Sequence, residues 1–430
     1  MERRFDTSER CARGLDRDDP LSPFRDRFYI PAGTIYVDGN SLGLLSRDAE
    51  RSLQRVVHEW RTKGIKGWLD GEVPWFHLAE RLGEMAAPLV GAEPAEVVAT
   101  GTTTFNIHSL VSTFYHPRNG RTKIIASSLD FPTDIYALKS QIALSGLKPD
   151  EELLLVPPDG HSPLEESAII DSMSGKVALI LLPSVLYRSG QLLDMEALTE
   201  AAHRYGIIIG FDCSHSIGAV PHYFDRWGVD FAVWCSYKYL NGGPGSPAFL
   251  YLNKRHFDRY PALAGWFGCI KERQFDMNLA FEHAPSAGGW QVSSPGILGA
   301  AAAQGALEIT LEAGIGRIRE KSLTMTGYLI FLADALLGPE PYAFSIGTPR
   351  EAARRGGHVA LVHEREAMRI KEALIERGVI PDYRPPDIIR IAPIPLYNTY
   401  HELWRLAVVL REIVDTGAFE KYDVKRRLIP

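Results

Sequence analysis

The chain has 430 residues and a formal net charge of -6, with 45% hydrophobic and 23% charged residues. This composition is typical of globular proteins, and the lack of a basic patch favours a small-molecule ligand over nucleic acid. No membrane-spanning run and no signal-peptide core are found, so we expect a cytoplasmic protein without a membrane partner. The four cysteines (Cys11, Cys213, Cys235, Cys269) predict free thiols, and no spacing of ligand residues indicates a metal site.

Extended and helical patterns alternate along the first part of the chain, which predicts an α/β fold with a mostly parallel sheet. Helices are expected after the PLVG stretch at 88–91, and at 134–145 and 195–205. Strands are expected at 122–127, 177–183, 206–212, 229–236 and 247–253. Several of these strands are apolar on both faces, as buried parallel strands are.

The pattern changes after the turn-rich segment 286–296. Two long helices are expected at 297–314 and 315–338, followed by short strands at 357–363 and 388–395 and a helix near 400–415. We therefore expect an N-terminal arm (1–45) that is part of a small domain, a large sheet domain (46–310) and a smaller C-terminal α/β domain (311–430).

Asp212 ends one predicted strand and Lys238 follows at the end of the next, with residues 213–228 as the crossover between the two strands. Both side chains should emerge at the carboxyl ends of neighbouring strands, where open α/β sheets bind ligands. An amine and a carboxylate placed in this way suit pyridoxal phosphate, because the amine forms a Schiff base and the carboxylate keeps the pyridine nitrogen protonated. A salt bridge at the strand ends explains these two residues about equally well.

Two further segments contain groups that such a cofactor needs. Residues 100–106 (TGTTTFN) supply hydroxyls and a glycine before an expected helix, whose N-terminal amides favour a phosphate, although a simple helix cap is the alternative. In residues 130–136 (DFPTDIY), Phe131 can cover one face of the cofactor ring and Asp134 can reach its polar edge. An ordinary turn with an aspartate cap is equally plausible for this segment.

These segments and several others resemble kynureninase, a pyridoxal-phosphate-dependent hydrolase family of the aspartate-aminotransferase fold (fold type I). The likeness extends from about residue 23 to residue 415. It is carried by PFRDRFYIP (23–31), GNSLGL (39–44), FPTD (131–134), FDCSH (211–215), DFAVWCSYKYLNGGPG (230–245), GWFG (265–268) and IRIAPIPLYN (389–398). The resemblance implies a PLP-dependent transferase-like large domain with a smaller C-terminal α/β domain.

The resemblance also assigns roles to individual residues. It makes Lys238 the Schiff-base lysine, Asp212 the partner of the pyridine nitrogen and Phe131 the stacking ring. The remaining cofactor contacts that it implies are Thr103, Thr104 and Tyr237 at the phosphate, His215 and Asp134 elsewhere, and Trp266 and Ser294 reaching the phosphate from the partner subunit of a homodimer. Tyr237 can also take part in proton transfer.

For the substrate, the resemblance implies that Arg390 holds the α-carboxylate, a task for which a planar bidentate donor is suited. Without this resemblance, a strand arginine is usually a solvated edge charge. Ser41 and Trp68 would lie near the substrate, although a role as a core aromatic explains Trp68 about equally well.

The activity implied is hydrolysis of the Cβ–Cγ bond of L-kynurenine, 3-hydroxykynurenine or a ring-substituted analogue, giving an anthranilate and L-alanine in tryptophan catabolism or NAD biosynthesis. Cysteine desulfurases and transaminases share the fold and are alternatives, as is a cofactor-binding homologue without turnover. The chain departs from the family at Cys269, where histidine is common, and at Ser294, where asparagine or threonine is common. These changes predict a roomier and less polar substrate pocket.

Overall fold

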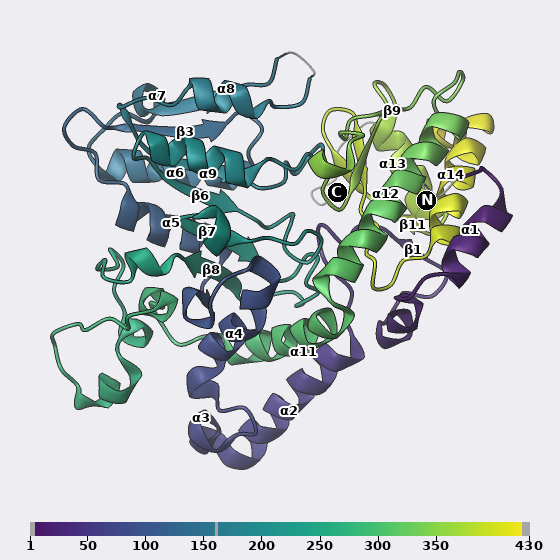
Figure 1. The fold of residues 1–430 in the computed structure, drawn as a ribbon. Coiled ribbons are helices and arrows are strands. Elements are labelled where there is room, and N and C mark those ends of the chain that lie inside the picture. The colour runs from purple at the N-terminus through teal and green to yellow at the C-terminus, as the bar shows by residue number, and fades with distance from the viewer. Residues whose placement is uncertain (1–4, 160–161, 424–430) are drawn as a thin grey trace.

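A computed structural model describes residues 5–159 and 162–423. The ends of the expected N-terminal arm and C-terminal domain, residues 1–4 and 424–430, lie outside the described residues. The chain forms two bodies that lie side by side, one built on a seven-stranded sheet and the other on a four-stranded sheet (Figure 1). Both described ends of the chain lie in the second body.

The large sheet has the strand order β2-β8-β7-β6-β5-β3-β4, in which only β8 runs against the others. Its strands are β2 (Val97–Ala99), β3 (Lys123–Ser127), β4 (Leu153–Val156), β5 (Val177–Pro183), β6 (Ile208–Asp212), β7 (Phe231–Cys235) and β8 (Ala248–Leu252). The mostly parallel sheet and its five predicted strands are thus confirmed. The strands β2 and β4 were not predicted, because runs of three or four apolar residues do not distinguish a strand from a helix.

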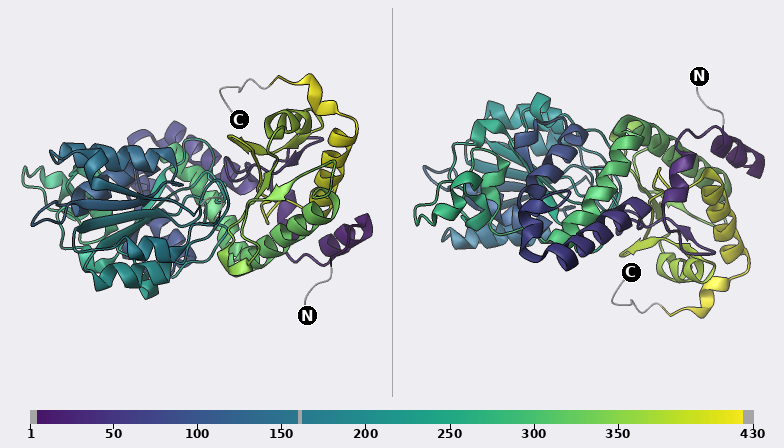
Figure 2. Two further views of the ribbon diagram at one scale, coloured as in Figure 1. Left: turned by 90° about the horizontal axis from the view of Figure 1, so that it is seen from above. Right: turned by 90° about the horizontal axis from the view of Figure 1, so that it is seen from below.

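Helices cover both faces of this sheet (Figure 2). Along β5, Ile180 and Leu182 face one core while Leu179 and Leu181 face the other, because successive side chains of a strand alternate. Helices α4, α9 and α11 pack on the first face and α5 and α6 on the second. The helices of this body are α2 (Arg47–Lys63), α3 (Gly67–Asp70), α4 (Leu78–Val90), α5 (Thr103–Phe114), α6 (Pro132–Leu144), α7 (Pro149–Glu152), α8 (Glu166–Asp171), α9 (Met195–Arg204), α10 (Phe224–Trp227) and α11 (Ile297–Ala313).

The helix expected after residues 88–91 is wrong. The PLV residues form the last turn of α4, and Gly91 ends that helix in the left-handed conformation with a φ of 62°. A short 3-10 turn at Pro94–Glu96 and the strand β2 follow instead. Glycine is the residue that adopts this conformation without a steric cost, which marks the stretch as a helix end rather than a beginning.

The second body combines the two ends of the chain. Its antiparallel sheet has the order β12-β13-β10-β9, and a separate parallel pair joins β1 to β11. The predicted strands at 357–363 and 388–395 correspond to β10 and β13, and the predicted helices at 315–338 and 400–415 to α12 and α14. The elements are α1 (Glu9–Arg17), β1 (Ile35–Tyr36), α12 (Ile315–Leu336), β9 (Ser345–Ile346), β10 (Val359–Val362), α13 (Ala367–Glu376), β11 (Val379–Ile380), β12 (Asp382–Arg384), β13 (Ile388–Ile391) and α14 (Tyr400–Asp415).

The two bodies are joined by backbone hydrogen bonds between the loop that follows β5 and the segment that leads into β10. Gly356 donates its N–H to the carbonyl of Gly190 at 2.8 Å, and Leu192 donates to Arg354 at 2.9 Å. Gly190 has a φ of 74°, and a Cβ at this position would lie 2.7 Å from the carbonyl oxygen of His358. Only glycine allows this approach, so the segment that leads into β10 lies directly against the loop that follows β5.

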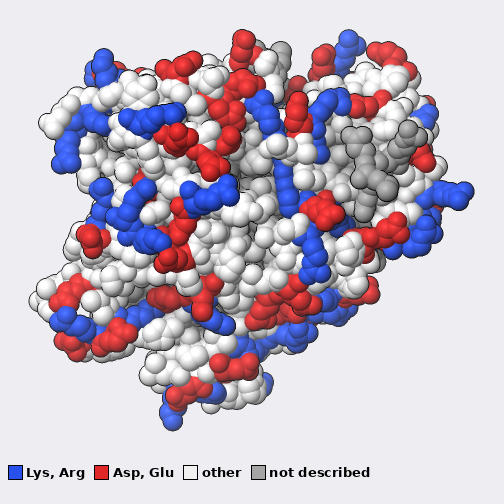
Figure 3. Space-filling model, viewed as in Figure 1, with Lys and Arg blue, Asp and Glu red and all other residues white. Residues whose placement is uncertain are grey.

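Charges of both signs are interspersed over the face of the molecule shown in Figure 3. Within the described ranges, every helix is too short or too polar to cross a lipid bilayer.

Candidate active site

Asp212 is the last residue of β6, and Lys238 comes shortly after the end of β7. Because β6 and β7 are parallel neighbours, both residues lie at the carboxyl edge of the sheet, as the sequence predicted. The Lys238 Nζ lies 3.0 Å from the Nε2 of His215. Burial lowers the pKa of His215 well below its ordinary value, and the charge of Lys238 lowers it further, so a neutral imidazole accepts the hydrogen bond.

Three carboxyl groups gather at this edge. Asp134, in the first turn of α6, is hydrogen-bonded to Asp212, and its pKa is raised well above the ordinary value by burial and then by the charge of Asp212. Asp134 therefore holds a proton and donates to Asp212, whose Oδ1 also accepts the N–H of Ser214 at 2.8 Å. These two hydrogen bonds fix the orientation of the Asp212 carboxyl group.

Asp130 was not singled out in the sequence, although it opens the quoted segment DFPTDIY. Its Oδ2 accepts the N–H of Ser127 at 3.1 Å, and its Oδ1 is buried without a partner among the described residues. Burial raises its pKa well above the ordinary value. Asp130 is therefore neutral and adds little charge to the cluster.

Phe131 precedes α6 and is 43% exposed. It meets the ring of Tyr187 edge-on, with centroids 5.3 Å apart and an interplanar angle of 88°. A large aromatic face at the mouth of a site is available to stack on a flat ligand.

The α5 terminus is capped by Thr102, whose hydroxyl accepts the N–H of Phe105 at 3.4 Å. In the part of the chain that the structure describes, the hydroxyls of Thr103 and Thr104 have no hydrogen-bond partner, so the cap uses neither. Gly101 before them has a φ of 57°. The first amides of this helix and two unused hydroxyls form a suitable anion cradle.

The GNSLGL segment (39–44) packs directly against the loop that contains Lys238. Gly43 donates its N–H to the carbonyl of Tyr237 at 2.7 Å, and a Cβ on Gly43 would lie 2.5 Å from the carbonyl oxygen of Lys238. On the other side, a Cβ on Gly39 would lie 2.2 Å from Ile394. The two glycines therefore let this segment pass between the two bodies. Burial raises the pKa of the Tyr237 phenol, which remains a neutral donor.

Arg390 lies on β13 and is fully buried, so it is not the solvated edge charge that a strand arginine usually is. Its guanidinium forms an ion pair with Asp382 across the β12–β13 pair. It donates through Nη1 to the carbonyl of Tyr187 at 2.7 Å and through Nη2 to the hydroxyl of Ser41 at 3.3 Å. Residues from both bodies thus hold this arginine beside the lysine cluster, which consists of Lys238, His215, Asp212 and Asp134.

The other predicted site residues lie in a separate groove. Trp68, Trp266 and Ser294 line a hollow of about 620 Å³ together with several apolar side chains. Trp68 is partly exposed and packs on Trp75 and Phe267, with ring centroids 6.0 Å away in each case. Among the described residues, no hydrogen bond joins this groove to the Lys238 cluster of the same chain.

Cys269 lies beside this groove in a smaller hollow that it shares with Trp266. Its thiol is partly exposed, and burial followed by the charge of Glu282 raises its pKa. The cysteine is thus mostly protonated and near the groove rather than at Lys238.

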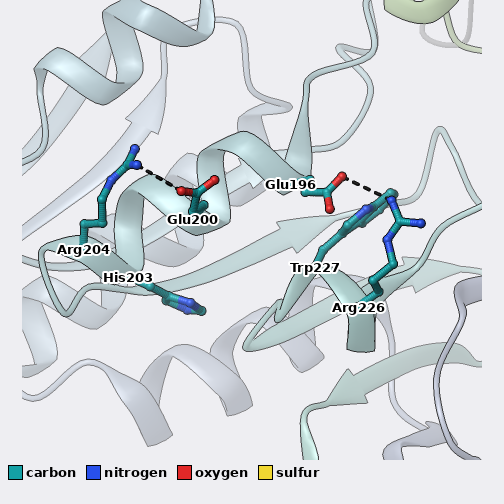
Figure 4. A pocket seen from close by; sticks show the side chains of 6 residues that line it. All are labelled: Glu196, Glu200, His203, Arg204, Arg226 and Trp227. Carbon is teal, nitrogen blue, oxygen red and sulfur yellow. Dashed lines mark hydrogen bonds and ion pairs between the residues drawn. The ribbon is translucent and has the colours of Figure 1, made fainter.

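A further hollow, of about 430 Å³, lies between α9 and α10 on the surface (Figure 4). Its charged side chains pair with one another, Glu200 with Arg204 at 3.1 Å and Glu196 with Arg226 at 3.5 Å. It contains none of the residues of the lysine cluster. Within the described ranges, no group of three or more His, Cys, Asp or Glu side chains is placed to hold a metal ion.

Comparison with known proteins identifies the family. A family model described as the kynureninase C-terminal domain matches residues 318–410. The chain is 52% identical to the kynureninase of Geobacillus thermodenitrificans over 418 residues, 97% of each chain, and 51% identical to a kynureninase of Bacillus cereus over 425 residues, 99% of each. A cysteine desulfurase from Thermococcus onnurineus NA1 has a similar structure, with a TM-score of 0.77, 18% identity, and coverage of 94% of this chain and 98% of that chain. The last likeness concerns the fold alone, whereas the relatives that match almost the whole sequence show that the chain belongs to the kynureninase family.

Proposed function

We propose that this chain is a pyridoxal-phosphate-dependent hydrolase that cleaves the Cβ–Cγ bond of L-kynurenine or a ring-substituted relative, releasing an anthranilate and L-alanine. The observation that carries the proposal is the convergence of Lys238, Asp212 and Arg390 at the junction of the two bodies. An amine, a carboxylate and a buried guanidinium are the groups that this reaction needs. The 52% identity to a kynureninase supports the same conclusion.

The residues at the sheet edge fit pyridoxal phosphate. Buried Nδ1 of His215 and Oδ1 of Asp134 have no partner among the described residues, as expected for atoms that meet a ligand. Lys238 would hold the cofactor through a Schiff base and Asp212 would pair with its ring nitrogen. Phe131 would cover the ring, and Thr103, Thr104 and Tyr237 would meet the phosphate. When bound, the cofactor supplies a sink for the electrons of a bond broken at the substrate.

Side chains of the protein itself would bind the substrate and move the proton. Arg390 holds the substrate carboxylate next to Ser41, and this orients the α-carbon toward Lys238. The amine of Lys238 would take the α-proton of the bound substrate. The neutral His215 accepts a hydrogen bond from this amine and so fixes its position. Asp134 keeps its proton and donates it in a hydrogen bond to the carboxyl group of Asp212.

We further propose that the active unit is a homodimer in the cytoplasm. Exposed apolar residues surround the groove of Trp266 and Ser294, including Ile65 (81% exposed), Leu69 (67%) and Phe275 (71%). A contiguous apolar surface of this kind is typical of a protein interface. A second copy seated there would bring Trp266 and Ser294 to the phosphate of its own site, which explains why they lie apart from Lys238 within one chain. The arm (1–45), large domain (46–310) and small domain (311–430) remain our division of the chain.

Reduction of the purified protein with borohydride tests the Schiff-base assignment. We expect a yellow protein whose visible absorbance is lost on reduction, with the label on Lys238 in a peptide map. Lys271→Ala is a suitable control, because this lysine lies in the other groove, where it pairs with Glu80 at 2.6 Å. A label on another lysine, or a protein that stays colourless after incubation with pyridoxal phosphate, would contradict the proposal.

Catalysis is tested by incubation with kynurenine and 3-hydroxykynurenine, with alanine and the aromatic product assayed together. Production of both in equal amounts is expected. Retained visible absorbance without alanine release would show a cofactor-binding homologue instead, and release of sulfide from cysteine would show a desulfurase.

Ring selectivity should be modest in the native protein. Cys269 hydrogen-bonds more weakly than the histidine common in the family, and Ser294 reaches less far than an asparagine. Apolar pockets distinguish ring substituents only weakly. The measurement compares kcat/KM for kynurenine, 3-hydroxykynurenine and a ring-methylated analogue in the native protein and in Cys269→His. A native preference of more than about a hundredfold for the hydroxylated substrate would overturn this prediction.

A further inference from the structure

Asp38 lies directly before the GNSLGL segment and beside the proposed carboxylate site. Its backbone forms a parallel bridge with Ala392, shortly after β13. Its carboxylate accepts a hydrogen bond from Ser41, whose hydroxyl lies 3.3 Å from the Nη2 of Arg390. The Oδ1 of Asp38 is shielded from solvent and has no partner among the described residues. Ser41 thus links Asp38 to the arginine.

The charges around Arg390 are balanced without a ligand. Asp382 pairs with Arg390 and also with Arg384, whose Nε lies 3.1 Å away. Asp38 has no ion pair of its own within the described ranges. Two carboxylates thus face two guanidinium groups, and Asp38 is the less firmly held of the two carboxylates.

The other titratable groups around Asp38 cannot offset an added charge. They are the phenols of Tyr36, Tyr239 and Tyr397, whose pKa values are all raised by burial. His215 and His358, which face Arg390, both have a lowered pKa, to about 3 in His358, and remain neutral. The charge of Lys238 also acts on both histidines, but in the holoenzyme its amine would be held by the cofactor. A ligand carboxylate at Arg390 would therefore bring a third carboxylate to the two guanidinium groups.

A buried surplus charge is costly, and a group that can neutralise itself does so. Burial, and then the charge of Asp382, already raise the pKa of Asp38 to about 7. A further negative charge nearby raises that pKa again. Asp38 is thus ionised in the free protein above about pH 7 and is the group that takes a proton most easily when a carboxylate arrives.

We propose that Asp38 takes up one proton from solvent when the substrate's α-carboxylate binds to Arg390, so that substrate binding and protonation of Asp38 are coupled. The inference rests on the proposed function, because it requires Arg390 to be the carboxylate site. Its consequence is that binding weakens as the pH rises above about 7, whereas below that pH the proton is already present.

The test uses the holoenzyme and 4-oxo-4-phenylbutanoate, which has the aroyl and carboxylate groups of the substrate but no amine to react with the cofactor. Titration calorimetry in buffers of different ionisation enthalpy gives the number of protons taken up. We expect uptake to approach one proton per site at about pH 8 and to fall toward zero at about pH 6. The visible spectrum, recorded in parallel, reports whether the lysine linkage is protonated instead.

Asp38→Asn is neutral and of the same shape, and should bind the probe at about pH 8 without proton uptake. Asp387→Asn is the matched control, because the carboxylate of Asp387 pairs with Arg188, at 3.6 Å, and not with Arg390 or Arg384, so proton uptake in this variant should equal that of the native protein. Uptake that persists in Asp38→Asn, or is absent from the native protein, would overturn the role of Asp38. If Arg390→Ala binds the probe as tightly as the native protein, the carboxylate site itself is misassigned and the inference is overturned with it.

Discussion

Asp212→Asn is expected to keep the fold and to slow exchange of the substrate α-proton by about a thousandfold or more, because a preorganised charge at the reacting centre is lost. Asparagine has the shape of aspartate but cannot stabilise a protonated ring nitrogen. In the structure, hydrogen bonds from Asp134 and from the N–H of Ser214 hold the carboxyl group of Asp212 in place. The measurement is deuterium exchange at the α-carbon, followed by NMR in heavy water.

Asp130→Asn is the matched control for this variant. Asp130 belongs to the same cluster, but its raised pKa leaves it neutral, so the substitution removes no charge. Its exchange rate should stay near that of the native protein. Near-normal exchange in Asp212→Asn, with unchanged circular dichroism in both variants, would assign the ring nitrogen to another group.

Arg390→Ala is expected to weaken substrate binding by about 2–5 kcal/mol, the usual loss when one partner of a buried charge pair is removed. This corresponds to a rise in Kd of about 30-fold to 4,000-fold. The arginine is fully buried and pairs with Asp382, so its removal also leaves that carboxylate without its main partner. The measurement is the Kd of the substrate or of 4-oxo-4-phenylbutanoate, together with KM.

Two further variants separate binding from folding in this experiment. Arg390→Ala combined with Asp382→Asn removes the stranded charge, and should restore thermal stability without restoring binding. Arg188→Ala removes a neighbouring guanidinium that pairs with Asp387, and should leave KM nearly unchanged. An unchanged KM in Arg390→Ala would mean that the substrate carboxylate binds elsewhere.

The parallel sheet could be predicted because its strands are apolar on both faces, as in the run from Val177 to Pro183. The positions of Asp212 and Lys238 followed from the same pattern, since residues at the ends of neighbouring parallel strands meet at one edge. The strands β2 and β4 were missed because they are too short to have a period of their own. Residues 88–91 were misread, because Gly91 ends a helix there.

The partners of the predicted residues could not be read from local patterns. Asp382 meets Arg390 through the register of β12 on β13, and Asp38 reaches the same site from the other end of the chain. Neither contact has a spacing that marks it in the sequence. Trp266 and Ser294 came only from resemblance to the family, and within one chain they lie in a groove apart from Lys238.

The pairing of β1 with β11 joins Ile35 to Val379, so the second body needs both ends of the chain. A ribosome makes the chain from its N-terminus, and domains generally fold as they emerge. The large sheet, complete at Leu252, can therefore assemble while residues 35–38 still have no strand to pair with. Lys238 and Asp212 are then in place before Arg390 has been synthesised. A nascent chain, or one truncated before Val379, thus contains the amine and the carboxylate of the site but not the guanidinium that would bind a substrate.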